Sequence, residues 1–232
     1  MTIPDIHEDE KFRAYLPQDD KFLNELEERS RENDVAIIGS HVGGLLNMLV
    51  KMTGARRILE LGTANGYSSI WMAKALREIG KKKVLHNDLD QTRQEGGDDG
   101  EDPNTNAITT MEWDMKVAEE ARKNIADAGV SDLVTVIQGD ARQLIESLGD
   151  HIGPYDMIFL DVEKEFYSDL LDPCIELLRQ GGLLVFDNTA FVTAGDFLDR
   201  SFKHPALQTI HLFGFLPNHG PEYDAITLAL KI

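Results

Sequence analysis

Short apolar runs alternate with helical patterns along most of this 232-residue chain, and this alternation limits the possible folds most strongly. Buried strands are predicted at residues 57–61, 107–111, 134–138, 157–160 and 183–186. Helices are predicted after them, at residues 68–79, 115–128, 142–148, 167–178 and 194–202. Such regular alternation predicts an α/β fold, a parallel sheet with helices on both of its faces.

Both ends of the chain extend this pattern. Residues 21–30 and 39–52 predict two helices before the first strand. At the other end, alternating apolar runs at residues 209–213 and 225–230 are separated by prolines, an asparagine and a glycine. These runs predict an antiparallel hairpin with a long turn at one edge of the sheet.

One stretch, residues 88–106, breaks the rhythm. Its centre, from Glu95 to Pro103, holds five acids and three glycines and no apolar residue. This composition predicts a solvated loop insertion, and a calcium loop is disfavoured because the EF-hand order of ligands is absent. Just before it, Val84-Leu85-His86 fits either a short strand or the tail of a linker.

The overall charge and the single cysteine disfavour several functions. A formal net charge of −18 repels nucleic-acid phosphates, so a small-molecule substrate is favoured over a nucleic-acid partner. Cys174 alone forms no internal disulfide and no multi-cysteine metal site, and its helical surroundings predict a buried thiol. No apolar run reaches the roughly 18 residues that span a bilayer, and the acidic N-terminus is unlike a secretory signal. We therefore expect no membrane association and a cytoplasmic location.

A glycine-containing segment, Glu60-Leu61-Gly62-Thr63-Ala64-Asn65-Gly66, lies between the first predicted strand and a helix. In an open α/β sheet, ligands bind beyond the carboxyl ends of the strands, and glycine there lets the backbone approach a ligand closely. The spacing of Gly62 and Gly66 matches neither dinucleotide-binding folds nor the lysine-bearing phosphate loop. The segment alone therefore predicts a ligand site without identifying the ligand.

Acidic residues at the next two strand ends narrow the choice of ligand. A carboxylate at the end of the second strand can accept both hydroxyls of a ribose, and Asp88, Asp90 and Glu112 compete for this role. Asp88 and Asp90 have the usual spacing of about twenty residues from the glycines. We choose Glu112, because a helix follows it and the acidic insertion explains the extra length. Asp140 follows the third strand, where it could meet an adenine amino group, so a nucleoside-like ligand is predicted.

Further oxygen-bearing side chains follow the fourth and fifth strands. Asp161 ends the run at 157–160, and Asp187 and Asn188 end the run at 183–186. Neighbouring parallel strands would bring the three together, and their hard oxygen atoms suit magnesium, manganese or calcium better than zinc. The alternative is that Asp161 and Asp187 cap the helices that follow them. The residues alone do not choose between these interpretations.

Taken in order, these motifs resemble the cation-dependent class I O-methyltransferases, which include catechol and caffeoyl-coenzyme A O-methyltransferases. The likeness runs from about residue 39 to 188 and includes Asp161-x-x-Lys164-x-x-Tyr167 and Gly181-Gly182-x-x-x-x-Asp187-Asn188. It implies a Rossmann-like, seven-stranded, mostly parallel sheet and S-adenosylmethionine (SAM) as cofactor. It also implies a methyltransferase domain at residues 54–232, preceded by N-terminal helices at 1–53 that form a lid or a dimer contact.

The resemblance gives each matching position a role. Lys164 would be the general base, and Asp161, Asp187 and Asn188 would bind the divalent cation. Ser68 would reach the carboxylate of the methionine part and Glu112 the ribose. The complete cofactor set that the resemblance implies is Glu60, Gly62, Ala64, Tyr67, Ser68, Glu112, Trp113, Asp140, Ala141 and Asp161.

The sequence thus predicts a homodimeric enzyme that moves a methyl group from SAM to a hydroxyl of a small, aromatic or catechol-like acceptor. One alternative is methylation of a hydroxylated uridine in tRNA, which Arg56-Arg57 and Lys81-Lys82-Lys83 keep open against the overall acidity. Another is a SAM-binding protein without transfer activity. The tail histidines, His204, His211 and His219, are interpreted as ordinary turn or edge residues.

Overall fold

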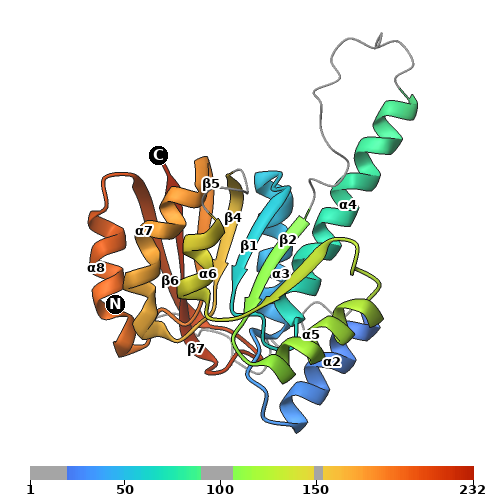
Figure 1. Ribbon diagram of the computed structural model, residues 1–232, viewed down its shortest axis with the longest axis horizontal. Helices are drawn as coiled ribbons and strands as arrows, with labels where there is room; N and C mark the ends of the chain where they lie inside the picture. Colours follow the sequence, from blue (N-terminus) through green and yellow to red (C-terminus); the bar gives the residue numbers. More distant parts are fainter. Residues whose placement is uncertain (1–19, 90–106, 149–153) are drawn as a thin grey trace, which may run out of the picture.

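The computed structural model describes residues 20–89, 107–148 and 154–232. These residues form a seven-stranded sheet in the order β3-β2-β1-β4-β5-β7-β6 (Figure 1). The first five strands run parallel, whereas β7 is antiparallel to both β5 and β6. The strands are β1 (Arg57–Leu61), β2 (Ala107–Glu112), β3 (Val134–Gln138), β4 (Tyr155–Leu160), β5 (Leu178–Phe186), β6 (Leu207–Phe215) and β7 (Tyr223–Lys231).

Helices cover both faces of the sheet and enclose a hydrophobic core on each (Figure 1). One core lies under α2 (Lys21–Glu32), α3 (Gly39–Thr53), α4 (Tyr67–Leu89) and α5 (Met115–Asp127). The other lies under α6 (Ala141–Leu148), α7 (Tyr167–Leu177) and α8 (Gly195–Lys203). The short turns η3 (Lys164–Phe166) and η4 (Val192–Ala194) directly precede α7 and α8. Cys174 is fully buried in this second core, as predicted.

Local signals in the sequence set the bounds of these elements. Ile58, Leu59 and Leu61 make β1 apolar on both sides, as a central parallel strand requires. The carboxylate of Asp114 accepts hydrogen bonds from the backbone N–H groups of Lys116 and Val117 and so starts α5. At the other end of a helix, Gly54 takes a left-handed conformation (φ 62°) that ends α3.

The predicted α/β fold, parallel sheet and C-terminal hairpin are confirmed. One detail differs from the prediction, and another lies outside the described residues. Val84-Leu85-His86 belongs to neither a strand nor a linker, because α4 continues through these residues to Leu89. Most of the acidic insertion, from residue 90 to 106, lies outside the described residues. Within the described part of the chain, no helix is both long enough and apolar enough to cross a bilayer.

The strand register brings the ends of β1, β4 and β5 to one edge of the sheet. Leu61 is paired with Leu160, and Leu160 with Phe186, so the residues that follow each strand are neighbours. Backbone hydrogen bonds continue one step further, from the Asp161 N–H to the Leu61 carbonyl (2.8 Å) and from the Asp187 N–H to the Leu160 carbonyl (3.0 Å). From β1 the sheet continues through β2 to β3, and from β4 it continues through β5 in the opposite direction. A ligand crevice is expected where the strand order reverses in this way.

Candidate functional site

A cleft of about 760 Å³ opens at this edge of the sheet. Its walls come from the loop after β1, the ends of β2 and β3, and the turn after β4. The sequence-predicted residues that line it are Gly62, Ala64, Glu112, Trp113, Asp140, Ala141, Asp161 and Lys164. The structure therefore brings together eight of the positions singled out from the sequence. The other predicted residues are buried beside or beneath the cleft: Glu60, Tyr67, Ser68, Asp187 and Asn188.

The loop after β1 is shaped by residues with positive φ. Gly62 (φ 97°) lies so close to the Asp161 carbonyl that a Cβ atom there would collide with it. Ala64 (φ 45°) has a conformation that is uncommon for a residue with a side chain. Its N–H donates to Oε2 of Glu112 (2.9 Å), so one predicted ligand-binding residue holds another in place.

Glu60 lies beneath this loop and is completely buried. The hydroxyl groups of Ser68 and Ser69 both donate to its carboxylate. Burial raises the pKa of Glu60 to about 7, and the charge of Asp161 contributes, although the serine hydroxyls act in the opposite direction. A carboxyl group that titrates near neutral pH therefore lies under the part of the loop predicted to face the ligand. The resemblance assigns the Ser68 hydroxyl to the carboxylate of the methionine part, but in this structure the hydroxyl donates to Glu60.

Arg142 is a cleft residue that the sequence reasoning missed. Its guanidinium group binds both oxygens of Asp140 (3.0 and 2.6 Å) and lies 4.0 Å from the ring centroid of Phe166. The hydrogen bonds from Arg142 lower the pKa of Asp140, which stays ionised. The position of Arg142 next to Gly139-Asp140-Ala141 could have suggested this contact, whereas nothing in the local sequence points to Phe166. Trp113, which also lines the cleft, is mostly exposed.

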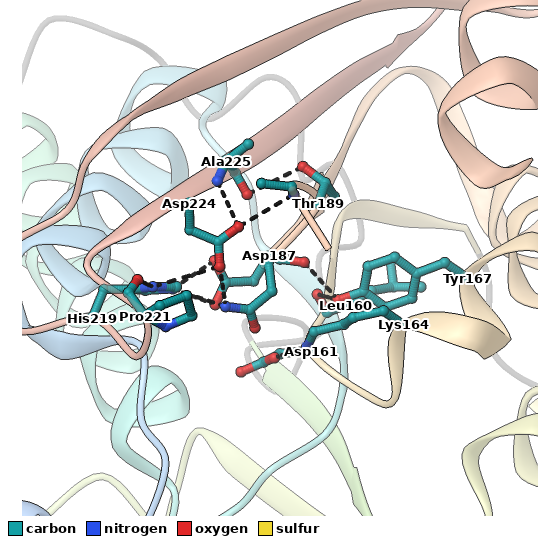
Figure 2. Close-up of polar contacts among 12 residues, drawn as sticks. Leu160, Asp161, Lys164, Tyr167, Asp187, Thr189, His219, Pro221, Asp224 and Ala225 are labelled. Atoms are coloured by element: carbon teal, nitrogen blue, oxygen red, sulfur yellow. Dashed lines mark hydrogen bonds and ion pairs between the residues drawn. The ribbon is translucent and has the colours of Figure 1, made fainter. Parts of the chain in front are cut away.

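The turn after β4 places an ammonium group against a carboxylate. Nζ of Lys164 lies 2.7 Å from Oδ1 of Asp161, and both side chains are partly buried. Only 15% of the Lys164 side chain is exposed. Its ammonium group also lies 5.5 Å from the ring centroid of Tyr167, whose hydroxyl donates to the carbonyls of Leu160 and Asp187. Tyr167 thus ties the ends of β4 and β5 together beneath Lys164 (Figure 2).

A buried ion pair lies at the end of β5. Nε2 of His219 is 3.0 and 2.9 Å from the two oxygens of Asp187, and Nδ1 is 2.8 Å from the carbonyl of Pro221 (Figure 2). The carbonyl of Pro221 can only accept, so Nδ1 carries a hydrogen, and where Asp187 is ionised Nε2 carries one as well and the ring is cationic. Burial alone would lower the pKa of His219, but the hydrogen bond and charge of Asp187 raise it to about 9.

This pair corrects the interpretation of His219 as an ordinary turn or edge histidine. The side chain is almost completely buried and contacts a strand end that is 32 residues away in the sequence. Burial raises the pKa of the Asp187 carboxyl, while the hydrogen bond from His219 opposes that rise. No motif connects His219 with Asp187, so only the fold of the long turn between β6 and β7 reveals the contact.

Asp161, Asp187 and Asn188 offer oxygen donors of the kind that hard divalent cations prefer. The amide nitrogen of Asn188 (φ 50°) donates to Asp224 (2.7 Å), so the amide oxygen points away from Asp224. The donor chemistry fits magnesium, manganese or calcium, although both carboxylates already contact a cationic side chain. Over residues 20–89, 107–148 and 154–232, no three His, Cys, Asp or Glu side chains form a cluster suited to a metal.

The capping alternative for the two aspartates is wrong. Among the described elements, the turns and helices that follow β4 and β5 begin without a hydrogen bond from a capping side chain. Their first residues are preceded by Glu163, Phe166, Phe191 and Ala194. The aspartates are therefore engaged with Lys164 and His219 instead.

Comparison with known proteins gives consistent matches to one family. A family profile described as a methyltransferase domain matches residues 59–189, and another described as O-methyltransferase matches residues 13–97. The chain is 31% identical to a catechol O-methyltransferase of Niastella koreensis, over 83% of this chain and 75% of that protein. It is 29% identical to a catechol O-methyltransferase of Mycobacterium tuberculosis, over 82% and 73% of the two chains.

A solved structure extends the similarity to nearly the whole fold. The O-methyltransferase TomG of Streptomyces achromogenes, which is involved in tomaymycin synthesis and was crystallised with SAM, superimposes with a TM-score of 0.76. The match covers 96% of this chain and 95% of TomG at 26% identity.

Proposed function

This chain belongs to the O-methyltransferase family, and on that premise we propose that it methylates a hydroxyl of a small, catechol-like acceptor with SAM and a divalent cation. One observation carries the proposal: Lys164 and Asp161 lie in the same cleft as Glu112 and Asp140. Residues suited to a nucleoside are thus continuous with residues suited to activating a hydroxyl.

The nucleoside end of the cleft supports SAM as the methyl donor. The carboxylate of Glu112 suits the two ribose hydroxyls, while Trp113 and Asp140 suit the face and the amino edge of an adenine. Glu60 lies beneath the loop, and its carboxylate would pair with the ammonium group of the methionine part of SAM. Because Glu112 also holds Ala64, ligand binding and loop geometry depend on the same carboxylate.

The other end of the cleft supports proton removal from the acceptor. Asp161, Asp187 and Asn188 would hold the cation, which supplies Lewis acidity that lowers the pKa of a bound hydroxyl. Methyl transfer breaks a carbon–sulfur bond and forms a carbon–oxygen bond, while the hydroxyl proton goes to Nζ of Lys164, whose ammonium group would first release a proton to water. The contact between Asp161 and Lys164 (2.7 Å) keeps that nitrogen beside the proposed cation ligands.

Exposed apolar side chains near Lys164 support an aromatic acceptor. The turn η4 packs against η3, which contains Lys164, and it begins four residues after the proposed ligand Asn188. Here Phe191 is 44% exposed and Val192 is 95% exposed. A flat, apolar acceptor would cover these side chains and present its hydroxyl to Lys164.

We also propose a homodimer, supported by the edge of the sheet. Strand β6 is the last strand in the sheet order, and its face carries the exposed side chains of Ile210 and Leu212. Leu230 of β7 is exposed on the same face, because its register partner Gln208 lies two residues from Ile210 and so points to the same face. Covering such an apolar row with a second copy would remove it from water.

The proposal is tested by incubating the protein with SAM and catechol, with magnesium or with EDTA, and measuring methylated product by mass spectrometry. We expect product with magnesium and its loss with EDTA, and we expect Asp187→Ala to lose the response to magnesium. A parallel reaction with tRNA tests the alternative acceptor. Methylation of tRNA but not of catechol contradicts the proposed acceptor, and product that is unaffected by EDTA contradicts the role of the cation.

A further inference from the structure

Helix α2 is connected to the loop after β1 by buried polar contacts. Nδ2 of Asn65 donates to the hydroxyl oxygen of Ser30 (2.7 Å), and both residues are only 2% exposed. The Ser30 hydroxyl donates in turn to the Leu26 carbonyl (2.7 Å) on its own helix. Because its single hydrogen is used within α2, Ser30 is available to Asn65 only as an acceptor.

Asn65 itself is held from three sides. Its side-chain oxygen accepts from the N–H of Tyr67 (3.3 Å), and its backbone carbonyl accepts from Nδ2 of Asn124 in α5 (3.0 Å). Asn65 stands between Ala64 and Gly66, whose positive φ angles give the loop its shape. The contact from Ser30 therefore acts on the residue between two unusual backbone conformations.

A second contact joins the same helix to the start of α4. The hydroxyl of Tyr67 donates to Oε2 of Glu27 (2.8 Å), and the Glu27 side chain is buried although it also pairs with Arg31. The beginning of α2 is tied to α4 as well, through the ion pair between Asp20 and Lys74. Leu23 and Leu26 complete the attachment by packing into the core.

Moving a helix that is held in this way away from the loop is energetically unfavourable. Lifting α2 would separate Asn65, Glu27 and Tyr67 from their buried partners and would expose the side chains of Leu23 and Leu26 to water. A lid, in contrast, is normally attached by few buried contacts.

We infer that α2 is a fixed support of the SAM-binding loop rather than a lid, and that Ser30 is a positioning residue that acts on SAM through Asn65. The inference rests on the proposed use of SAM. Ser30 lies behind the loop and away from the residues that line the cleft, so its effect on the ligand is indirect.

The decisive experiment compares Ser30→Ala with Ser201→Ala by calorimetric titration with SAM. Ser201 is a fully buried serine of α8, on the other face of the sheet, whose hydroxyl also donates to a carbonyl of its own helix. We expect Ser30→Ala to weaken SAM binding about tenfold, the loss of one buried hydrogen bond, and Ser201→Ala to leave it unchanged. Turnover at saturating SAM should be retained in Ser30→Ala, because the acceptor end of the cleft is untouched. Equal SAM affinity in the two variants overturns the inference.

Hydrogen exchange separates this inference from the proposed function. We expect faster exchange in residues 62–69 of Ser30→Ala than of Ser201→Ala, and protection of α2 that is the same with and without SAM. Strong protection of α2 only when SAM is added would show a lid and overturn the inference. If the unmodified protein does not bind SAM at all, the proposed function fails, while the exchange of residues 62–69 still decides whether Ser30 positions the loop. Should Ser30→Ala fold poorly, Tyr67→Phe removes the neighbouring contact with Glu27 and should weaken SAM binding in the same direction.

Discussion

The two ends of the cleft are organised by different kinds of contact. At the ends of β1 and β2, backbone N–H groups and hydroxyls supply the partners: Ala64 donates to Glu112, and two serines donate to Glu60. At the ends of β4 and β5, each carboxylate faces a cationic side chain, Asp161 with Lys164 and Asp187 with His219. The ends of β1 and β2 are held by neutral donors and form the neutral end of the site, whereas the ends of β4 and β5 are balanced by charge and form its charged end; Asp140, after β3, is paired with Arg142.

This difference suggests what each end contributes. Neutral contacts fix the geometry of the loop before a ligand arrives, so changing one of them should alter SAM affinity and little else. Charge pairs leave the carboxylates able to exchange partners, so changing a cationic side chain should alter turnover, stability or the response to a metal.

The largest effect is expected for Lys164→Ala. If Nζ takes the hydroxyl proton, kcat should fall by about 10²- to 10⁴-fold, the usual contribution of a general base. SAM affinity should change little, because the nucleoside end of the cleft is untouched. Turnover with catechol at saturating SAM and calorimetric titration with SAM measure the two quantities.

The control for this variant is Lys203→Ala, which removes an exposed lysine paired with Asp199 on α8. It should keep both turnover and SAM affinity. A loss in Lys164→Ala that is equally large for turnover and for SAM affinity would contradict the role of Lys164 as base.

The next largest effect is expected for His219→Ala. The variant leaves Asp187 buried without its cationic partner, which should lower the free energy of unfolding by about 3–5 kcal/mol. Manganese should then raise the melting temperature more than in the unmodified protein, because a metal at Asp187 replaces the lost charge. Urea unfolding and thermal scans with and without manganese measure both.

The control is His204→Ala, since His204 lies 3.6 Å from Asp172 at the surface of the molecule. It should shift stability only slightly. If manganese stabilises His219→Ala no more than the unmodified protein, Asp187 is not a ligand of the cation.

The sequence predicted the neutral end of the site better than the charged end. Gly62 follows directly after β1 and Glu112 ends β2, so both are predictable because parallel strands bring such positions together, whereas Ala64 was implied by the resemblance. The same rule placed Asp161 beside the loop. Lys164 was found through the resemblance of its motif, and its partner is only three residues away.

His219 and Ser30 could not be found in this way, for physical reasons. His219 reaches Asp187 only because the long turn between β6 and β7 folds back over the end of β5. Ser30 looks like any polar residue near the end of an amphipathic helix, and its contact with Asn65 joins residues that are 35 positions apart. A single sequence records spacing within elements, whereas these contacts depend on how separate elements pack.

A smaller effect, confined to SAM affinity, is expected for Glu112→Gln. The substitution keeps the shape of the side chain but removes the charge that strengthens the hydrogen bond from Ala64 and the proposed hydrogen bonds from the ribose hydroxyls. Hydrogen bonds to charged groups contribute about 1.5–3 kcal/mol, so the Kd for SAM should rise about ten- to hundredfold. Calorimetry should show this rise, while Glu119→Gln, on the exposed side of α5, should bind SAM normally. Lost turnover at saturating SAM would instead place Glu112 in the chemistry.

The smallest effect is the pH dependence of SAM binding. If ionised Glu60 faces the methionine ammonium group, SAM affinity should fall about tenfold per pH unit below the pKa of Glu60, which is about 7, and should level off above it. The stability of the protein without SAM should change in the opposite direction. Because the folded pKa lies above its ordinary value of 4.5, the contribution of Glu60 to folding is complete below pH 4.5 and is lost as the pH rises through 7.

Glu60→Gln provides the reference for this last prediction, because an amide at this position cannot titrate. Calorimetric titrations with SAM between pH 5.5 and 8.5 (about one and a half units on each side of the pKa) should show a slope in the unmodified protein and none in the variant. Buffers of different ionisation enthalpy should reveal proton release on binding only when Glu60 is present. If both proteins lose affinity equally on acidification, the titrating group lies elsewhere. The neutral end of the cleft would then contain no charge that SAM needs, apart from that of Glu112.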